Sequence, residues 1–257
     1  MLKKENNLIK INNHTKFLSR PDAILIDIDN TLFPYDEAHN SALDEVKNKM
    51  MKMLNINESY FKKKYTSAKS HVKKELIDTA SSHSRLIYFQ KMMELMNLGS
   101  SISLALDFEK TYWRTFMLNM KIFECVKEFF DELRLKNIPL VAITDLTAEI
   151  QFKKLIFLEL ENFFEYVVTS EESGKDKPNK NSFKLAIKKL NITYKLEDQH
   201  FWMIGDNLIK DMIGSKEAIN ATTILKLRKE VKNNNRIYTP DATFTNFFHL
   251  KQFVSKL

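Results

Sequence analysis

An apolar run that ends in two aspartates constrains the fold of this chain more than any other feature. Residues 23–26 read Ala-Ile-Leu-Ile, and Asp27, Asp29 and Thr31 follow them. Such a run is typical of a strand that is buried on both faces of a parallel sheet. Ligands of open α/β sheets bind beyond the carboxyl ends of the strands, so the sequence predicts a site at these acids. Taken alone, the same residues also fit an Asp-rich turn that closes a strand.

After Pro34 the sequence changes to a helical pattern, which continues to about residue 120. Apolar residues recur there at three- and four-residue steps, and Gly99 is expected to cap the third helix. Helices are predicted over about 43–54, 61–76, 85–97 and 102–116. Helices without an intervening strand cannot form a single βαβ crossover. A helical cap domain of residues 35–120 is therefore predicted, inserted into a core of residues 1–34 and 121–257.

From about Lys121 onward, helical and extended patterns alternate. Strands are predicted over 138–143, 166–169, 201–204 and 221–225, with helices between them and an edge element with a closing helix in the tail. This alternation predicts an α/β fold, with a doubly wound parallel, Rossmann-like sheet in the core. The polar residues 1–22 are expected to be a loosely attached lead-in.

The composition limits the partners and the compartment. The formal charge of +7 and the pI near 9.2 favour anionic ligands in general, including nucleic acid. Most lysines stand beside acids at helical spacing, which indicates solvated faces, so no nucleic-acid partner is expected. The single Cys125 excludes an internal disulfide. No apolar run approaches the ~18 residues of a membrane span, and no signal segment is evident, so a cytoplasmic protein without a membrane partner is expected. The oligomeric state is left open.

Residues with side chains suited to phosphoryl transfer stand at several predicted strand or loop ends. They are Asp27, Asp29, Thr31, Thr144, Lys177, Asp206 and Asp211. A parallel sheet brings these ends to one edge, where the residues can share a pocket. Neighbouring carboxylates repel each other unless a cation or a shared proton intervenes. Carboxylates suit Mg²⁺, and Thr and Lys can bind the charge that spreads over a transferring phosphoryl group.

These residues carry a resemblance to a known family. The first motif is Asp27-Ile28-Asp29-Asn30-Thr31, the second is Thr144, the third is Lys177-Pro178, and the fourth is Gly205-Asp206-Asn207 with Asp211. In this order the motifs resemble those of the haloacid dehalogenase superfamily, in the subgroup with a helical cap inserted after the first motif. The resemblance covers about residues 23–220.

The resemblance implies a phosphoaspartate mechanism with Mg²⁺ as the cofactor. Asp27 would be the nucleophile, and Asp29 the general acid and then the base that activates water. Thr144 and Lys177 would hold the phosphoryl oxygens. The metal would be bound by the carboxylates of Asp27 and Asp206 and by the backbone carbonyl of Asp29. Asp211 would orient these ligands without binding the metal itself.

Two residues depart from the common family pattern, and a second lysine competes for a role. Asn30 stands where many relatives have Gly, a variant associated with phosphatases of nucleotides and sugar phosphates. Asp145 stands where many have Asn, and its carboxylate would repel a phosphate unless it points away or meets a cation. Lys175 competes with Lys177, but Lys177 directly precedes the proline, as in the family.

The segment 79–85 is a polar interruption between two predicted cap helices, without proline or glycine. It fits a simple helix boundary with a serine cap. It also fits a substrate contact, in which His83 and Arg85 bind the substrate when the cap closes over the core.

The expected enzyme is thus a Mg²⁺-dependent phosphatase of a small phosphorylated metabolite, such as a sugar phosphate or a nucleoside monophosphate. The alternatives are a phosphomutase of the β-phosphoglucomutase kind, a catalytically silent binding protein, and a basic nucleic-acid-binding module. A dehalogenase is disfavoured, because hydrolytic dehalogenation does not need Asp29 as an acid.

Overall fold

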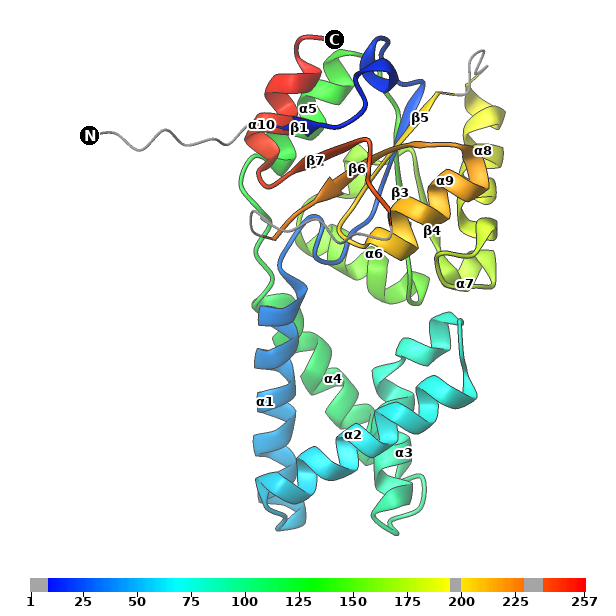
Figure 1. The fold of residues 1–257 in the computed structure, drawn as a ribbon. Coiled ribbons are helices and arrows are strands. Elements are labelled where there is room, and N and C mark those ends of the chain that lie inside the picture. The colour runs from blue at the N-terminus through cyan, green and yellow to red at the C-terminus, as the bar shows by residue number, and fades with distance from the viewer. Residues whose placement is uncertain (1–8, 195–199, 229–237) are drawn as a thin grey trace, which may run out of the picture.

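A seven-stranded sheet lies at the centre of the protein (Figure 1). The computed structural model describes residues 9–194, 200–228 and 238–257. The strand order is β1-β7-β6-β5-β2-β3-β4; β1 pairs antiparallel with β7, and the other neighbours are parallel. The strands are β1 (Lys10–Ile11), β2 (Ala23–Ile26), β3 (Leu140–Thr144), β4 (Tyr166–Thr169), β5 (Phe201–Gly205), β6 (Thr222–Lys226) and β7 (Ala242–Phe244).

The strand β2 lies in the middle of the sheet, between β5 and β3. Ile26 pairs with Ile204 of β5 and with Ala142 of β3, so the three strands reach their carboxyl ends close together. All residues of these strands are buried. This explains why the sequence shows continuous apolar runs here instead of an alternation of apolar and polar residues.

Helices cover both faces of the sheet. Ile24 and Ile26 of β2 belong to one core, while Ala23 and Leu25 belong to the other, as the two-residue period of a strand requires. The first core includes residues of α5 (Val126–Leu135), α6 (Ala148–Phe157) and α10 (Phe247–Val254); the second includes residues of α8 (Lys180–Thr193) and α9 (Gly214–Ile219). Shorter helices are η1 (His14–Phe17), η3 (Glu161–Phe163), α7 (Ser170–Ser173) and the π-helix η4 (Leu208–Ile213). The predicted doubly wound α/β fold is confirmed.

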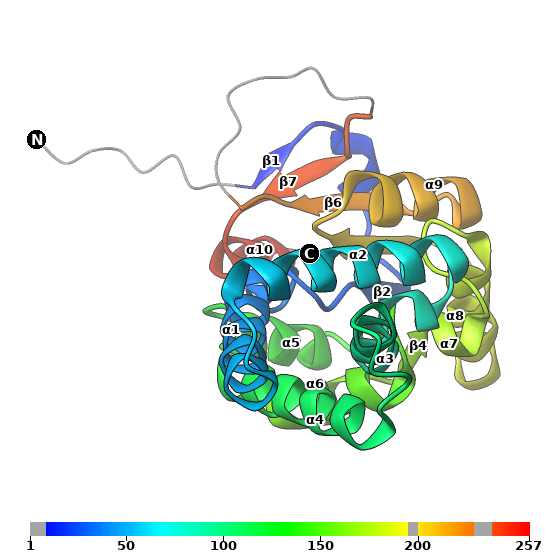
Figure 2. The ribbon, with the colours of Figure 1, turned by 90° about the horizontal axis from the view of Figure 1, so that it is seen from below.

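A separate group of helices stands beyond the strand ends. It consists of α1 (Tyr35–Leu54), α2 (Glu58–Glu75), the 3₁₀ turn η2 (Ala80–His83), α3 (Arg85–Leu95) and α4 (Ile102–Leu118). Helix α1 packs on α4, and α2 packs on α3. Buried aromatic rings, among them Phe89, Phe108 and Tyr112, fill the space between them. Figure 1 shows these helices below the sheet, and Figure 2 shows them in front of it.

The helical insertion expected after the first strand is therefore present, and we call α1, α2, η2, α3 and α4 the cap and the rest of the protein the core. The proposed boundaries of these units, after residues 34 and 120, stay a prediction. Among the described residues, no helix is long and apolar enough to cross a membrane.

Two local expectations were wrong. Residues 9–22 are not a loose lead-in, because β1 pairs with β7 and Phe17 is buried edge-on against Trp202 and Phe253. The left-handed residue directly behind α3 is Asn97, with φ 60°, instead of Gly99. Asparagine is one of the few non-glycine residues that adopt this conformation readily.

Candidate active site

The candidate active site begins with three carboxylates at neighbouring strand ends. Asp27 follows β2, Asp206 follows β5, and Asp211 lies in η4. Their carboxylate oxygens lie within 4.8 Å of one another. Asp27 is nearly buried, and Thr31 donates a hydrogen bond of 3.0 Å to its Oδ2. The sequence predicted that these acids share one pocket, and in the structure they lie close together.

Lys177 joins two of the carboxylates. Its Nζ donates to Asp27 Oδ1 at 2.7 Å, to Asp211 Oδ1 at 2.6 Å and to the carbonyl of Ile143 at 3.0 Å. All three donors of the ammonium group are therefore used. Lys175, the competing lysine, is exposed and does not line the pocket. Lys177, preferred over Lys175 because it directly precedes the proline, is thus the one that contacts Asp27, and its role in holding the phosphoryl oxygens stays a prediction.

Gly205 allows Asp211 to come this close. A Cβ atom on residue 205 would lie only 2.3 Å from Asp211 Oδ2, far inside van der Waals contact. The same Oδ2 accepts a hydrogen bond of 3.0 Å from the backbone N–H of Asn207. The fourth motif thus needs a glycine because the π-helix turns its aspartate back against the end of β5.

Burial and repulsion between carboxylates raise the pKa of Asp27 and Asp206. Burial raises the pKa of Asp27 well above its usual range, and although Lys177 opposes this rise, Asp211 and Asp206 add to it. Burial and the charge of Asp211 raise the pKa of Asp206 to about 6. Burial alone would lower the pKa of Lys177, but the carboxylates of Asp211 and Asp27 raise it, so the lysine stays charged.

The donor set fits a divalent metal with oxygen ligands. Asp27, Asp206 and Asp211 offer only carboxylate oxygens, which hard cations such as Mg²⁺ prefer. A cation at this cluster would also relieve the repulsion that raises the pKa of Asp27 and Asp206. The residues present are therefore compatible with the expected metal.

Thr144 and Asp145 end β3 beside the same cluster. The hydroxyl of Thr144 accepts a hydrogen bond of 2.8 Å from Gln151 Nε2. Asp145 accepts the backbone N–H of Lys177 at Oδ1 and forms an ion pair of 2.7 Å with Lys210 at Oδ2. The unusual carboxylate of Asp145 therefore meets a cation, which removes much of the repulsion that it would exert on a phosphate.

The side chain of Asp29 is held by residues that the sequence analysis missed. Lys154 Nζ donates to its two carboxylate oxygens at 2.7 and 2.8 Å, and Gln151 Nε2 donates to Oδ2 at 3.2 Å. Lys154 is completely buried, and its ammonium group also lies over the rings of Tyr35 and Phe116. Burial lowers the pKa of Lys154, an effect that Asp29 opposes.

A signal for this pair was present in the sequence. Gln151 and Lys154 share the buried face of α6 with Ile150 and Leu155. A lysine at a core position of an amphipathic helix requires a partner, because an unpaired buried charge is strongly unfavourable.

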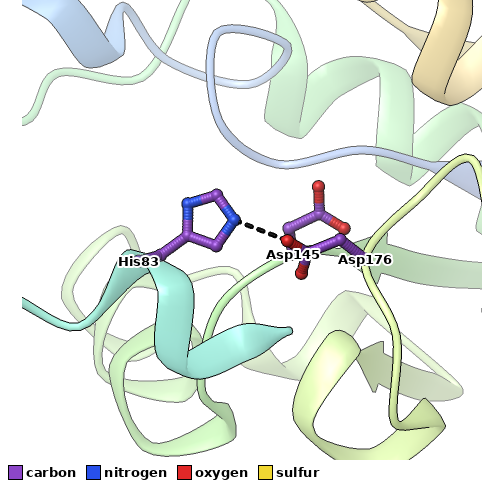
Figure 3. A group of neighbouring side chains, drawn as sticks. All are labelled: His83, Asp145 and Asp176. Atoms are coloured by element: carbon purple, nitrogen blue, oxygen red, sulfur yellow. Dashed lines mark hydrogen bonds and ion pairs between the residues drawn. The ribbon is translucent and has the colours of Figure 1, made fainter. Parts of the chain in front are cut away.

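The two cap residues predicted to bind substrate lie at the pocket. His83 Nε2 is 2.8 Å from Asp176 Oδ2, in the loop just before Lys177 (Figure 3). Asp145 lies next to this pair (Figure 3). Arg85 is buried and donates to the hydroxyl of Tyr35 and to the backbone carbonyl of His83. His83 therefore links the cap to the core, and its role in substrate binding, like that of Arg85, stays a prediction.

One pocket of about 280 Å³ connects these groups. Its core side includes Asp27, Asp29, Thr144, Lys177 and Asp206. Its cap side includes Lys69, Lys73, His83, Arg85 and Tyr88. The catalytic residues expected from the sequence thus face a cavity whose other wall belongs to the cap.

Comparisons with known proteins show the family to which the chain belongs. The model of the haloacid dehalogenase-like hydrolase family matches residues 21–218. The ribulose-1,5-bisphosphate 5-phosphatase of Halopiger xanaduensis is 29% identical over 204 residues, which are 79% of this chain and 83% of the relative. The glyceraldehyde 3-phosphate phosphatase of Methanopyrus kandleri is 28% identical over 207 residues, which are 80% of this chain and 84% of the relative.

Solved structures show the same fold. The 2-haloacid dehalogenase from Pseudomonas syringae has a TM-score of 0.72 at 18% identity, and the match covers 92% of this chain and 99% of that one. The expected enzyme class, a hydrolase with phosphatases among its relatives, is confirmed. This chain belongs to the haloacid dehalogenase-like hydrolase family.

Proposed function

We propose that the protein is a Mg²⁺-dependent phosphatase that hydrolyses a small sugar phosphate through a phosphoaspartate intermediate on Asp27. The observation that carries this proposal is the position of Asp27 at the end of β2, in contact with Lys177 and within 4.8 Å of Asp206 and Asp211. Two of its relatives are named for phosphatase activity on ribulose-1,5-bisphosphate and on glyceraldehyde 3-phosphate.

In the first step a carboxylate oxygen of Asp27 attacks phosphorus, and the bond from phosphorus to the ester oxygen breaks. Asp29, in its protonated form, gives its proton to the departing alkoxide, which leaves as the alcohol. Lys177, with its high pKa, stays positively charged and stabilises the charge on the phosphoryl oxygens, and the hydroxyl of Thr144 donates to one of them. A metal bound by Asp27, Asp206 and the backbone carbonyl of Asp29, with Asp211 behind them, would supply further positive charge to the phosphoryl group.

In the second step water attacks phosphorus of the phosphoaspartate while Asp29 takes a proton from that water. The acyl phosphate bond breaks, inorganic phosphate is released, and the Asp27 carboxylate is restored. Tight contact between cap and core would keep bulk water out of the pocket during the first step. The pocket shared by cap and core supports this role.

A screen of phosphorylated sugars for phosphate release tests the proposal. The wild-type protein should release phosphate in the presence of Mg²⁺, and this release should stop when a chelator is added. Asp27→Asn should fold but lose almost all turnover, because an amide does not attack phosphorus. Asp44→Asn is a matched control, since Asp44 is exposed on α1 and, among the described residues, pairs only with Lys47 on that helix. Substantial turnover by Asp27→Asn would contradict the proposed mechanism.

The same assay separates the alternatives. A phosphomutase would convert a sugar phosphate into an isomer without net release of phosphate. A catalytically silent protein would not hydrolyse even an activated aryl phosphate.

A further inference from the structure

Two lysine side chains, Lys69 and Lys73, lie on the cap wall of the pocket. Lys69 and Lys73 are four residues apart on α2, so they lie on the same side of this helix. Both line the pocket that contains Asp27 and Lys177. In the described part of the chain, neither lysine forms a hydrogen bond or an ion pair. Arg85, on the same wall, donates only to uncharged oxygens of Tyr35 and His83.

The acids of the pocket are already engaged with cations of the core. The ion pairs are Asp27 and Asp211 with Lys177, Asp29 with Lys154, and Asp145 with Lys210. Asp206 has Arg228 at 3.9 Å. Lys69 and Lys73 take part in none of these ion pairs.

The cap cations repel one another. Burial and the charge of Arg85 lower the pKa of Lys69. Lys73 is exposed at the rim of the pocket; its partial desolvation, followed by the charges of Lys69, Lys210 and Arg85, lowers its pKa, whereas the charge of Asp176 opposes this shift. Such a group of like charges around a cavity is unfavourable until an anion enters, and it attracts anionic ligands.

The cap lysines stand apart from the groups expected to bind the reacting phosphate. Lys69 and Lys73 belong to the cap helix α2, which lies beyond the sheet (Figures 1 and 2), whereas Asp27, Thr144 and Lys177 line the pocket from the core. The reacting phosphate is expected at the core wall, beside Asp27. The cavity of about 280 Å³ has room for more than one phosphoryl group. The cap lysines thus face the end of the substrate that is remote from the reaction.

We propose that Lys69 and Lys73 form a subsite for a second anionic group of the substrate, either a phosphate or a carboxylate at the end remote from the reacting phosphate. This inference rests on the proposed function and narrows its substrate class to compounds with two anionic ends.

Matched substrate pairs test the subsite. Ribulose 1,5-bisphosphate is compared with ribulose 5-phosphate, and 3-phosphoglycerate with glycerol 3-phosphate; within each pair the main difference is the second anion. The wild-type protein should prefer the doubly anionic member of at least one pair. In Lys69→Gln/Lys73→Gln this preference in kcat/KM should fall by roughly tenfold or more, as expected for lost hydrogen bonds to a charged group. A preference restricted to one pair identifies the second anion as phosphate or as carboxylate.

A matched control distinguishes binding at the pocket from a general effect of removing two positive charges. Lys63→Gln/Lys74→Gln removes the same charge from the same helix, at exposed positions outside the pocket. It should retain the wild-type preference. Calorimetric titration into Asp27→Asn measures substrate binding without turnover. The ligand is ribulose 1,5-bisphosphate, or 3-phosphoglycerate if that pair shows the preference, and the titration is repeated with Lys69→Gln/Lys73→Gln added to Asp27→Asn. The pocket substitutions should weaken the affinity.

The results that would overturn this inference differ from those that would overturn the proposed function. Hydrolysis of monophosphates without any preference for a second anion would overturn the subsite alone. A preference that both double variants reduce equally, or that neither reduces, would also overturn it. The absence of phosphate release from every phosphate ester would instead overturn the proposed function.

Discussion

Lys154 shows how a single buried residue can control a catalytic group at a distance in sequence. Its ammonium group is fully buried, and Asp29, which is partly exposed to the pocket, is its ion-pair partner. We expect Lys154→Met to leave the fold intact, because methionine fills a similar volume and Asp29 can still be hydrated. Asp29 would then lose the contact that orients it.

The expected effect of Lys154→Met is a loss of turnover that is greater for alkyl than for aryl phosphates. Alkyl leaving groups depend more on protonation by Asp29, so a misplaced acid harms them more. Asp29→Asn should show the same selectivity with a greater loss, about 10²–10⁴-fold for an alkyl substrate. Lys153→Met is the control, since Lys153 is exposed and pairs with Glu149 on the same helix. Equal losses on both substrate types would argue against a positioning role.

Asp206 should make the stability of the metal-free protein depend on pH. Its pKa rises from the usual value near 4 to about 6 in the folded state, because of burial and the charge of Asp211. Between these values the folded state binds more protons than the unfolded state, so stability falls as the pH rises through this window. In chelator at neutral pH, Asp206→Asn should be more stable than the wild type by about 1–2 kcal/mol.

Addition of Mg²⁺ should reverse this order. The wild-type protein should gain stability, because a ligand that binds the folded state raises the free energy of unfolding. Asp206→Asn should gain much less, since it has lost one carboxylate ligand. Melting temperatures with chelator and with Mg²⁺ measure both effects, and an equal response of the two proteins to the metal would exclude Asp206 as a ligand.

At the scale of elements, the junction of β5 and η4 depends on a close approach that only glycine permits. In Gly205→Ala the new methyl group would collide with the carboxylate of Asp211. Either Asp211 moves away from Lys177, or the π-helix shifts. We expect a loss of about 1–3 kcal/mol in the free energy of unfolding, typical of overpacking, and a strong loss of turnover. Chemical denaturation and phosphate release measure the two effects; a variant with full stability and full activity would contradict this account.

At the scale of the whole molecule, His83 connects the cap to the core. Its hydrogen bond to Asp176 joins the cap to the loop directly before Lys177. His83→Ala should weaken the association of cap and core and raise KM by roughly 3–10-fold, with a smaller change in kcat, because one hydrogen bond to a charged group is lost. His71→Ala is the control, because His71 is exposed on α2 and its hydrogen bonds to described residues all lie within that helix. Small-angle scattering should show a more open average shape for His83→Ala alone.

The sequence by itself determined the parallel strands of the sheet, though not the edge strand β1, and the place of the site. Continuous apolar runs predict buried parallel strands, and the carboxyl ends of neighbouring parallel strands meet at one edge. For that reason Asp27, Thr144, Lys177 and Asp206 could be assigned to one pocket although they are far apart in the chain. The interruption of this pattern by helices predicted the cap in the same way, because both conclusions depend on local periodicity.

The tertiary structure alone decided which charges become partners. The ion pairs of Lys154 with Asp29 and of Lys210 with Asp145, and the contact of His83 with Asp176, join residues that local periodicity does not relate. Each depends on how a helix is rotated and placed over the strand ends, and many lysines compete for the same carboxylates in the sequence. The packing of the helices decides which lysine pairs with which carboxylate. A lysine reaches the pocket only where its helix backbone comes close enough and its side chain can be desolvated.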